Sequence, residues 1–251
     1  MGSKLLWMWF WVIFVFVSLD GRWSQGCLEQ ERLALLGLKP FFNSPFYLQN
    51  WVEGEYYSDC CQWDSVECNQ TTNRVIELYL GSTRNEDLGE WYLNTSLFSP
   101  FQELQILDLY NNSIAGCVEN KGFDKLSTLS NLEGLNLGYN SFNKSIISSL
   151  TTLSSLKNLY LYNNKLKGTI DLQGLRFMNN LEYLSLNGNT FNNSILSFLS
   201  APSSLKGLFI EDVGLKGTVD LSEIYDSLSN LEVLDMSNNQ INKLAVTRGT
   251  N

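Results

Sequence analysis

One nine-residue spacing of apolar residues, L-x-x-L-x-L-x-x-N, recurs seven times in this chain of 251 residues. The clearest copies read LQILDLYNN, LEGLNLGYN, LKNLYLYNN and LEYLSLNGN, and successive copies begin 24 to 29 residues apart. A repeat of this period constrains the chain to a solenoid in which every copy adds one coil. The seven copies begin at Val75, Leu104, Leu132, Leu156, Leu181, Leu205 and Leu231.

Apolar and variable residues alternate within each copy, which predicts a short strand with one buried face. One such strand cannot bury its leucines alone, but stacked copies bury them against each other, and about three copies are needed for a stable core. Spacing and period are typical of the leucine-rich repeat. The predicted fold class is therefore an α/β repeat solenoid, a horseshoe with short parallel strands on its concave face and an N-terminal helical disulfide cap.

Most copies end in an asparagine that lies among apolar residues. Burying its amide is costly unless backbone groups bond to it, and the amide offers both donors and acceptors to the turn that follows the strand. We therefore expect a ladder of asparagines that links successive coils. Its members are Asn112, Asn140, Asn164, Asn189 and Asn239.

The N-terminus predicts a secretory signal peptide over residues 1–26. Lys4 precedes a 13-residue apolar run from Leu5 to Val17, and small residues stand just before Cys27. A bilayer span needs about 20 apolar residues, so cleavage is favoured over an uncleaved anchor. We predict four regions: a signal peptide (1–26), a cap (27–70), about seven repeats (71–244) and an off-pattern tail (245–251).

The segment CLEQERLALLGL predicts a helix that covers the first coil, with Leu28, Leu35 and Leu38 on its buried face and Pro40 ending it. Four cysteines lie in the cap, and in an exported chain they are expected to form disulfides rather than a metal site. A bond between adjacent cysteines would be strained, and spacing leaves the two other connectivities open. The four are Cys27, Cys60, Cys61 and Cys68.

The fifth cysteine, Cys117, occupies a place that holds serine or threonine in equivalent repeats. We expect a buried free thiol there. An intermolecular disulfide is the alternative, because an odd cysteine is unusual in a secreted protein.

Composition argues against several functions. The chain has a net charge of −9, so an acidic solenoid without a basic patch disfavours nucleic acid. It has no histidine, which excludes Ser-His-Asp and Cys-His nucleophiles as well as histidine metal sites. The neighbouring acids Glu211 and Asp212 face opposite ways on a strand, so they do not form a catalytic pair. No enzyme, metal or cofactor is expected.

Five N-glycosylation sequons suit the secretory route. Asn143 and Asn192 occupy equivalent places just past a strand, and we expect them to be modified more readily than Asn111, which lies inside a repeat signature. The five sites are Asn69, Asn94, Asn111, Asn143 and Asn192.

Side chains that alternate with the buried leucines point to the concave face. Many are tyrosines, whose large area and polar tip suit recognition, although an aromatic ladder that only stabilises the sheet is an equal alternative. Tyr160 and Tyr162, two residues apart on one strand, are the strongest candidates for a ligand contact. The predicted ligand-binding residues are Tyr79, Asp108, Tyr110, Tyr139, Asn158, Tyr160, Tyr162, Tyr183, Phe209, Glu211 and Asp235.

The cap segments CLEQERLALLGLK and DCCQWDSVEC, the Trp51 position and the repeats followed by L-x-G-x-[IV] resemble plant leucine-rich-repeat receptor-like proteins, in the N-terminal part of the ectodomain. The resemblance implies the pairs Cys27–Cys60 and Cys61–Cys68. It also implies a solenoid on the exterior of the plasma membrane, held by one C-terminal membrane helix. Such proteins perceive a peptide, protein or microbial ligand and signal through a co-receptor kinase.

This chain lacks the later repeats, the C-terminal cysteine cap and the membrane helix that the resemblance implies. After Leu244 the segment AVTRGTN no longer follows the repeat pattern, and the last coil would expose its apolar edge. We predict a truncated form, with a deliberately short one as the alternative; as given, the chain would be secreted. The predicted function is ligand recognition for a cell-surface receptor-like protein. The alternative is a secreted inhibitor or decoy similar to polygalacturonase-inhibiting proteins.

Overall fold

A computed structural model describes residues 26–54, 59–168, 173–191, 193, 195, 203–221 and 230–245. The predicted signal peptide, apart from Gly26, lies outside these ranges, and so do Asn192 and the last six residues of the predicted tail.

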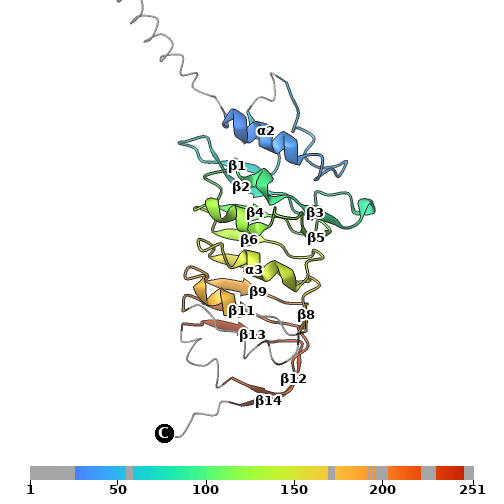
Figure 1. Ribbon diagram of the computed structural model, residues 1–251, viewed down its shortest axis with the longest axis vertical. Coiled ribbons are helices and arrows are strands. Elements are labelled where there is room, and N and C mark those ends of the chain that lie inside the picture. Colours follow the sequence, from blue (N-terminus) through green and yellow to red (C-terminus); the bar gives the residue numbers. More distant parts are fainter. Residues whose placement is uncertain are drawn as a thin grey trace, which may run out of the picture.

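The seven repeats and the cap contribute one strand each to a single sheet, in chain order. The strands from β2 to β13 are parallel, and β1 pairs antiparallel with β2. Equivalent leucines stand side by side, as Leu107, Leu135 and Leu159 do on three successive strands. The sheet strands are β1 (Val66–Cys68), β2 (Val75–Tyr79), β4 (Ile106–Asp108), β6 (Gly134–Asn136), β7 (Asn158–Tyr160), β9 (Tyr183–Ser185), β11 (Gly207–Phe209) and β13 (Val233–Asp235). Figure 1 shows this stack along the long axis of the molecule, which confirms the predicted fold class.

The residues that follow each nine-residue copy, such as LKGT from Leu166 and from Leu215, lie beside the main sheet on what we call the flank of the solenoid. In the part of the chain that the structure describes, three parallel strand pairs lie there: β3 (Trp91–Leu93) with β5 (Ile114–Cys117), β8 (Lys167–Gly168) with β10 (Thr190–Phe191), and β12 (Lys216–Asp220) with β14 (Gln240–Ala245). Short helical turns return the chain to the next strand. They are η2 (Cys60–Gln62), η3 (Glu86–Leu88), η4 (Thr95–Phe98), η5 (Phe123–Thr128), η6 (Lys144–Ile146), α3 (Ile147–Leu150) and η7 (Gln173–Phe177).

The leucines of the repeat signature form one continuous core between the sheet and these turns. Because each coil buries its leucines against those of its neighbours, no single coil has a core of its own. The buried signature residues include Leu78, Leu80, Leu107, Leu109, Leu135, Leu137, Leu159, Leu161, Leu184, Leu186, Leu208 and Ile210.

The asparagines form the expected ladder. The Oδ1 of Asn140 accepts hydrogen bonds from the backbone N–H groups of Asn112 and Ile114, at 3.1 and 2.9 Å. Its Nδ2 donates to the carbonyl of Leu109 on the preceding coil at 2.9 Å. Each amide therefore joins two coils through backbone groups that would otherwise be buried without partners.

Two repeats lack this asparagine, and other groups close their turns. The hydroxyl of Thr83 is buried and donates to the carbonyl of Leu80 at 2.6 Å. At Val213 the apolar side chain is buried, and the backbone N–H donates to the Oδ1 of Asn239 in the next coil at 3.1 Å.

The cap helix α2 (Glu29–Leu38) lies across the N-terminal end of the stack (Figure 1). Leu35 and Leu38 are buried as expected. The prediction that Leu28 lies on the same buried face is wrong, because Leu28 precedes the helix and is 38% exposed. Glu31 takes its place, one turn before Leu35 and fully buried. A buried carboxylate was not predicted, because its stabilising partners come from a distant segment.

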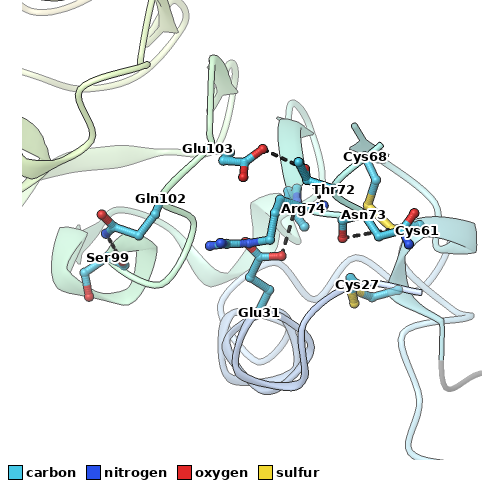
Figure 2. A network of polar contacts seen from close by, with 12 residues as sticks. Cys27, Glu31, Cys61, Cys68, Thr72, Asn73, Arg74, Ser99, Gln102 and Glu103 are labelled. Atoms are coloured by element: carbon cyan, nitrogen blue, oxygen red, sulfur yellow. Dashed lines mark hydrogen bonds and ion pairs between the residues drawn. A yellow bond between two sulfur atoms is a disulfide. The ribbon is translucent and has the colours of Figure 1, made fainter. Parts of the chain in front are cut away.

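Arg74 is the main partner of Glu31. Its Nε donates to the Oε1 of Glu31 at 2.8 Å, and the N–H of Val75 donates to Oε2 at 3.2 Å. Figure 2 shows Glu31 extending from the helix toward Arg74, with the Thr72–Glu103 hydrogen bond beside this pair. Burial is the main influence on the Glu31 carboxyl and raises its pKa, while Arg74 opposes that shift. The pair connects the cap helix to the first repeat strand.

Two disulfides close the cap, Cys27 with Cys60 and Cys61 with Cys68, with Cα–Cα distances of 5.6 and 5.5 Å. This pairing is the one that the family resemblance implied, and it decides between the two connectivities that spacing left open. Cys117 is a free, half-buried thiol. Burial raises its pKa to about 12, so it remains in the unreactive thiol form at neutral pH.

The last described coil is less covered than the others. Leu231, Leu234 and Met236 pack on the core but are only partly buried.

Within the described residues, no helix has the length and apolar character needed to cross a bilayer.

Candidate ligand-binding surface

The solvent-facing side of the eight-stranded sheet is the concave face of the solenoid. On each repeat strand, residues that alternate with the buried leucines face it, as Glu77 and Tyr79 do beside Leu78. Aromatic side chains gather near its middle, where tyrosines from three repeats meet.

Tyr110, Tyr139 and Tyr162 form this tyrosine cluster. The ring centroids of Tyr110 and Tyr139 are 5.3 Å apart, those of Tyr139 and Tyr162 are 5.7 Å apart, and those of Tyr110 and Tyr162 are 6.1 Å apart. The ring of Tyr162 fills the space above Gly138, where an added Cβ would lie 2.4 Å from its Cζ. Glycine at that position therefore admits the ring, and Tyr162 has a structural role in the sheet.

Tyr139 is conformationally unusual. It occupies the turn position just before the ladder asparagine and has a φ of 51°, in the left-handed region. Every other repeat places a residue with positive φ there: Ser82, Asn111, Asn163, Gly188, Asp212 and Asn238. A tyrosine in this conformation costs about 1–2 kcal/mol relative to glycine. The backbone does not require a tyrosine at this place, and its side chain is 49% exposed.

Beside the cluster lies an open hollow of about 410 Å³, which we call the concave hollow. Of the predicted binding residues it brings together Tyr139, Tyr160, Tyr162, Phe209 and Glu211. Its other lining residues, Asn163, Ser185 and Asn187, were not predicted. Ser185 and Asn187 alternate with buried leucines, so that spacing could have predicted them, whereas Asn163 lies in the left-handed turn, where alternation gives no signal.

Other predicted residues lie on the same face outside this hollow. Tyr79 donates a hydrogen bond to Glu77, which raises the pKa of Tyr79 to about 12. Tyr110 belongs to the cluster, and Tyr183 packs over Gly207 together with Phe209. Asn158 stands on β7 beside Tyr183 of β9.

The two remaining predicted acids are bonded locally. Asp108 accepts from the N–H of Tyr110 at 2.8 Å and from the Nδ2 of Asn136 at 3.3 Å, while burial raises the pKa of its carboxyl. Asp235 accepts from the hydroxyl and the N–H of Ser237, and these bonds lower its pKa. Both carboxylates therefore order the ends of their own strands.

The described sequons differ in how their amide nitrogens are used. Asn69, Asn94 and Asn143 use Oδ1 to accept backbone N–H groups of the following turn. The Nδ2 of Asn111, the atom that would carry a glycan, instead donates to the hydroxyl of Ser82 at 3.1 Å. Asn192 lies outside the described residues, so its modification stays a prediction.

We expect glycans on Asn69, Asn94 and Asn143 and none on Asn111, because the Nδ2 of Asn111 lies against Ser82 of the preceding coil, where a sugar would be crowded. Glycopeptide mass spectrometry of the chain secreted from plant cells measures the occupancy of each site. Occupancy at Asn111 equal to that at Asn143 would contradict this selection.

Comparison with known proteins identifies both parts of the fold. Residues 28–69 match the family profile of the leucine rich repeat N-terminal domain, and residues 230–247 match that of the leucine rich repeat. The chain is 38% identical over 167 residues to Receptor-like protein 9a of Arabidopsis thaliana and 40% identical over 167 residues to Cuscuta receptor 1 of Solanum lycopersicum. These matches take in 66% and 64% of this chain but only 17% and 14% of those relatives.

Solved structures agree with this similarity. The Arabidopsis receptor kinase HAESA, solved in complex with the peptide hormone IDA and the co-receptor SERK1, has a TM-score of 0.65 and 28% identity. That match covers 84% of this chain and 34% of that one. A match to the BIR3–SERK2 complex from Arabidopsis thaliana has a TM-score of 0.55 and 26% identity, over 88% of this chain and 100% of that one. The chain is therefore a leucine-rich-repeat solenoid that is similar, over 66% of its own length, to 17% of the length of Receptor-like protein 9a.

Proposed function

We propose that the chain is a recognition region of an extracellular receptor-like protein, and that its concave hollow binds a peptide segment of a ligand. It acts by binding and not by catalysis. In a longer form of the protein, a membrane helix would hold this region outside the plasma membrane, and a co-receptor kinase would transmit the signal.

The observation that carries this proposal is the exposed Tyr139 in a left-handed turn at the edge of the hollow. The left-handed turn recurs in every repeat, so what distinguishes this place is a large, exposed aromatic side chain in a conformation that favours glycine and asparagine. The rest of the fold holds such residues in place, and they cluster at ligand-binding sites. The similarity to receptor-like proteins, and to a receptor kinase solved with a peptide hormone, supports a peptide as the ligand.

Random peptides displayed on phage and selected against the immobilised, secreted full chain would test this proposal. Selected peptides should bind the wild type, and their affinity should fall about tenfold or more in Tyr139→Asn and in Tyr160→Ala, because aromatic residues dominate such contacts. Asparagine is favoured over tyrosine at positive φ. The relief of backbone strain in Tyr139→Asn should therefore offset the loss of the ring contacts that Tyr139 makes. Thermal unfolding should therefore show an intact fold.

Tyr92→Ala is the matched control, since Tyr92 is 62% exposed but lies on the flank strand β3. Peptides that bind all of these variants equally would remove the hollow as the binding site. A selection that enriches no peptide above the level on an unrelated protein would contradict peptide recognition itself.

A further inference from the structure

We infer that the concave hollow takes an arginine or lysine side chain of an extended peptide, with Glu211 as its counter-charge. This inference rests on the proposed function and adds the chemical class of the ligand.

The concave face carries negative charge and no positive charge at its outward strand positions. Each of the seven repeat strands presents three such positions, and none holds lysine or arginine. Because like charges repel and opposite charges attract over a Debye length of about 10 Å, this face favours a basic ligand. The carboxylates at these positions are Glu77, Asp108, Glu211 and Asp235.

Of these four, only Glu211 lines the hollow. Its Oε1 accepts a hydrogen bond from the Nδ2 of Asn238 at 2.6 Å, and its backbone N–H donates to the Oδ1 of Asn187 at 2.8 Å. These bonds hold the carboxylate at the edge of the hollow. Among the described residues, Glu211 takes part in none of the ion pairs.

The lysines inside the nine-residue repeat copies are already paired with other acids. They occupy the second position of the repeat, where lysine and glutamate alternate along the rim of the sheet. Lys157 pairs with Glu133 at 2.8 Å, and Lys206 pairs with Glu182 at 2.9 Å. Both of these lysines are therefore neutralised by rim glutamates, and the charge of Glu211 is left for a ligand.

The aromatic walls of the hollow favour a cation, as the carboxylate at its edge does. Tyr160 and Phe209 present aromatic rings, and a cation within about 6 Å of a ring centroid is attracted to its face. A guanidinium is planar, so it can stack on a ring while it donates two hydrogen bonds to a carboxylate. Arginine therefore fits better than lysine.

The same surroundings indicate an extended peptide around that side chain. The hollow is open to solvent and continues along the face of the sheet. Asn187 uses its Oδ1 for the backbone of Glu211, so its Nδ2 is placed to donate to a peptide carbonyl.

The test uses peptides selected on the wild-type chain and synthesised with arginine or with citrulline, its neutral isostere. We expect the selected peptides to share a basic position, and citrulline there to weaken binding about tenfold, a loss of about 1.4 kcal/mol. Glu211→Gln should cause the same loss for the arginine peptide and none for the citrulline peptide. Gln keeps the acceptor for Asn238, so the fold is retained.

Glu119→Gln is the matched control, because Glu119 is an exposed acid on the flank. Affinity of the arginine peptide should also fall with salt in the wild type and depend less on salt in Glu211→Gln. Peptides that lack a basic position, or that bind Glu211→Gln as tightly as the wild type, would overturn this inference. Peptides that are nevertheless sensitive to Tyr160→Ala would leave the proposed function standing.

Discussion

Arg74→Ala should lower the free energy of unfolding by about 3–5 kcal/mol, because it leaves the Glu31 carboxylate buried without its cation. The Glu31 side chain is fully buried, whereas that of Arg74 is 19% exposed. Val75 N–H remains as a partner, but one neutral donor does not replace a cation. Urea unfolding followed by tryptophan fluorescence measures the loss, since Trp51 and Trp63 stack in the cap.

The loss should shrink as the pH falls. Burial raises the pKa of Glu31 in the folded protein, and removal of Arg74 raises it further. A carboxyl with a raised folded-state pKa takes up its proton more readily when folded, so acidification through that pKa stabilises the variant relative to the wild type.

Two further variants isolate the buried charge. Arg32→Ala removes a pair with Glu29, whose side chain is 66% exposed, and should cost less than about 1 kcal/mol. Adding Glu31→Gln to Arg74→Ala removes the charge but keeps an acceptor for Val75, so it should recover more than half of the stability. A double variant as unstable as Arg74→Ala would show that the buried charge is not the cause.

Asn140→Ala should cost about 2–4 kcal/mol, because it leaves several buried backbone groups without partners at once. Its Oδ1 accepts from two N–H groups, and its Nδ2 donates to the carbonyls of Leu109, Leu137 and Gly138 at 2.9, 3.1 and 3.1 Å. These groups lie on two successive coils, so the substitution weakens the joint between them. Thermal and urea unfolding of the secreted chain measure the change.

The size of the effect should follow burial along the ladder. Asn164 is less buried than Asn140, and Asn164→Ala should cost about 1–3 kcal/mol. Asn180→Ala is the control: Asn180 is exposed and makes a single bond, to the carbonyl of Ser154 at 2.9 Å. Equal losses in Asn140→Ala and Asn180→Ala would refute the ladder as a source of stability.

Much of the fold could be predicted because the repeat is a local pattern. Leu107 and Leu109 are buried for the same reason as Leu135 and Leu137, since the same spacing recurs in each coil. The cap helix was predicted near its observed bounds, but Glu31 was not recognised as a buried residue. Its partner Arg74 lies 43 residues away, and no local periodicity reports a contact across that separation.

The sequence predicted which face of the sheet carries the candidate site, but it did not predict where on that face the site lies. Alternation assigned the tyrosines to the concave side, yet it treated Tyr160 and Tyr162 as equivalent. The structure distinguishes them: both line the hollow, but Tyr162 also covers Gly138. Tyr139 reaches the same cluster from a left-handed turn, which a period of two does not describe.

By itself, the sequence determined the solenoid, the order of its coils, the ladder of asparagines and the acidic, tyrosine-rich character of one face. These properties follow from residue spacing, and every coil repeats them. Only the tertiary structure decided which side chains of different coils converge on one hollow, which carboxylates are already bonded and which cation accompanies Glu31. Those outcomes depend on contacts between coils. The register of the strands and the size of the neighbouring side chains decide which residues of different coils come into contact.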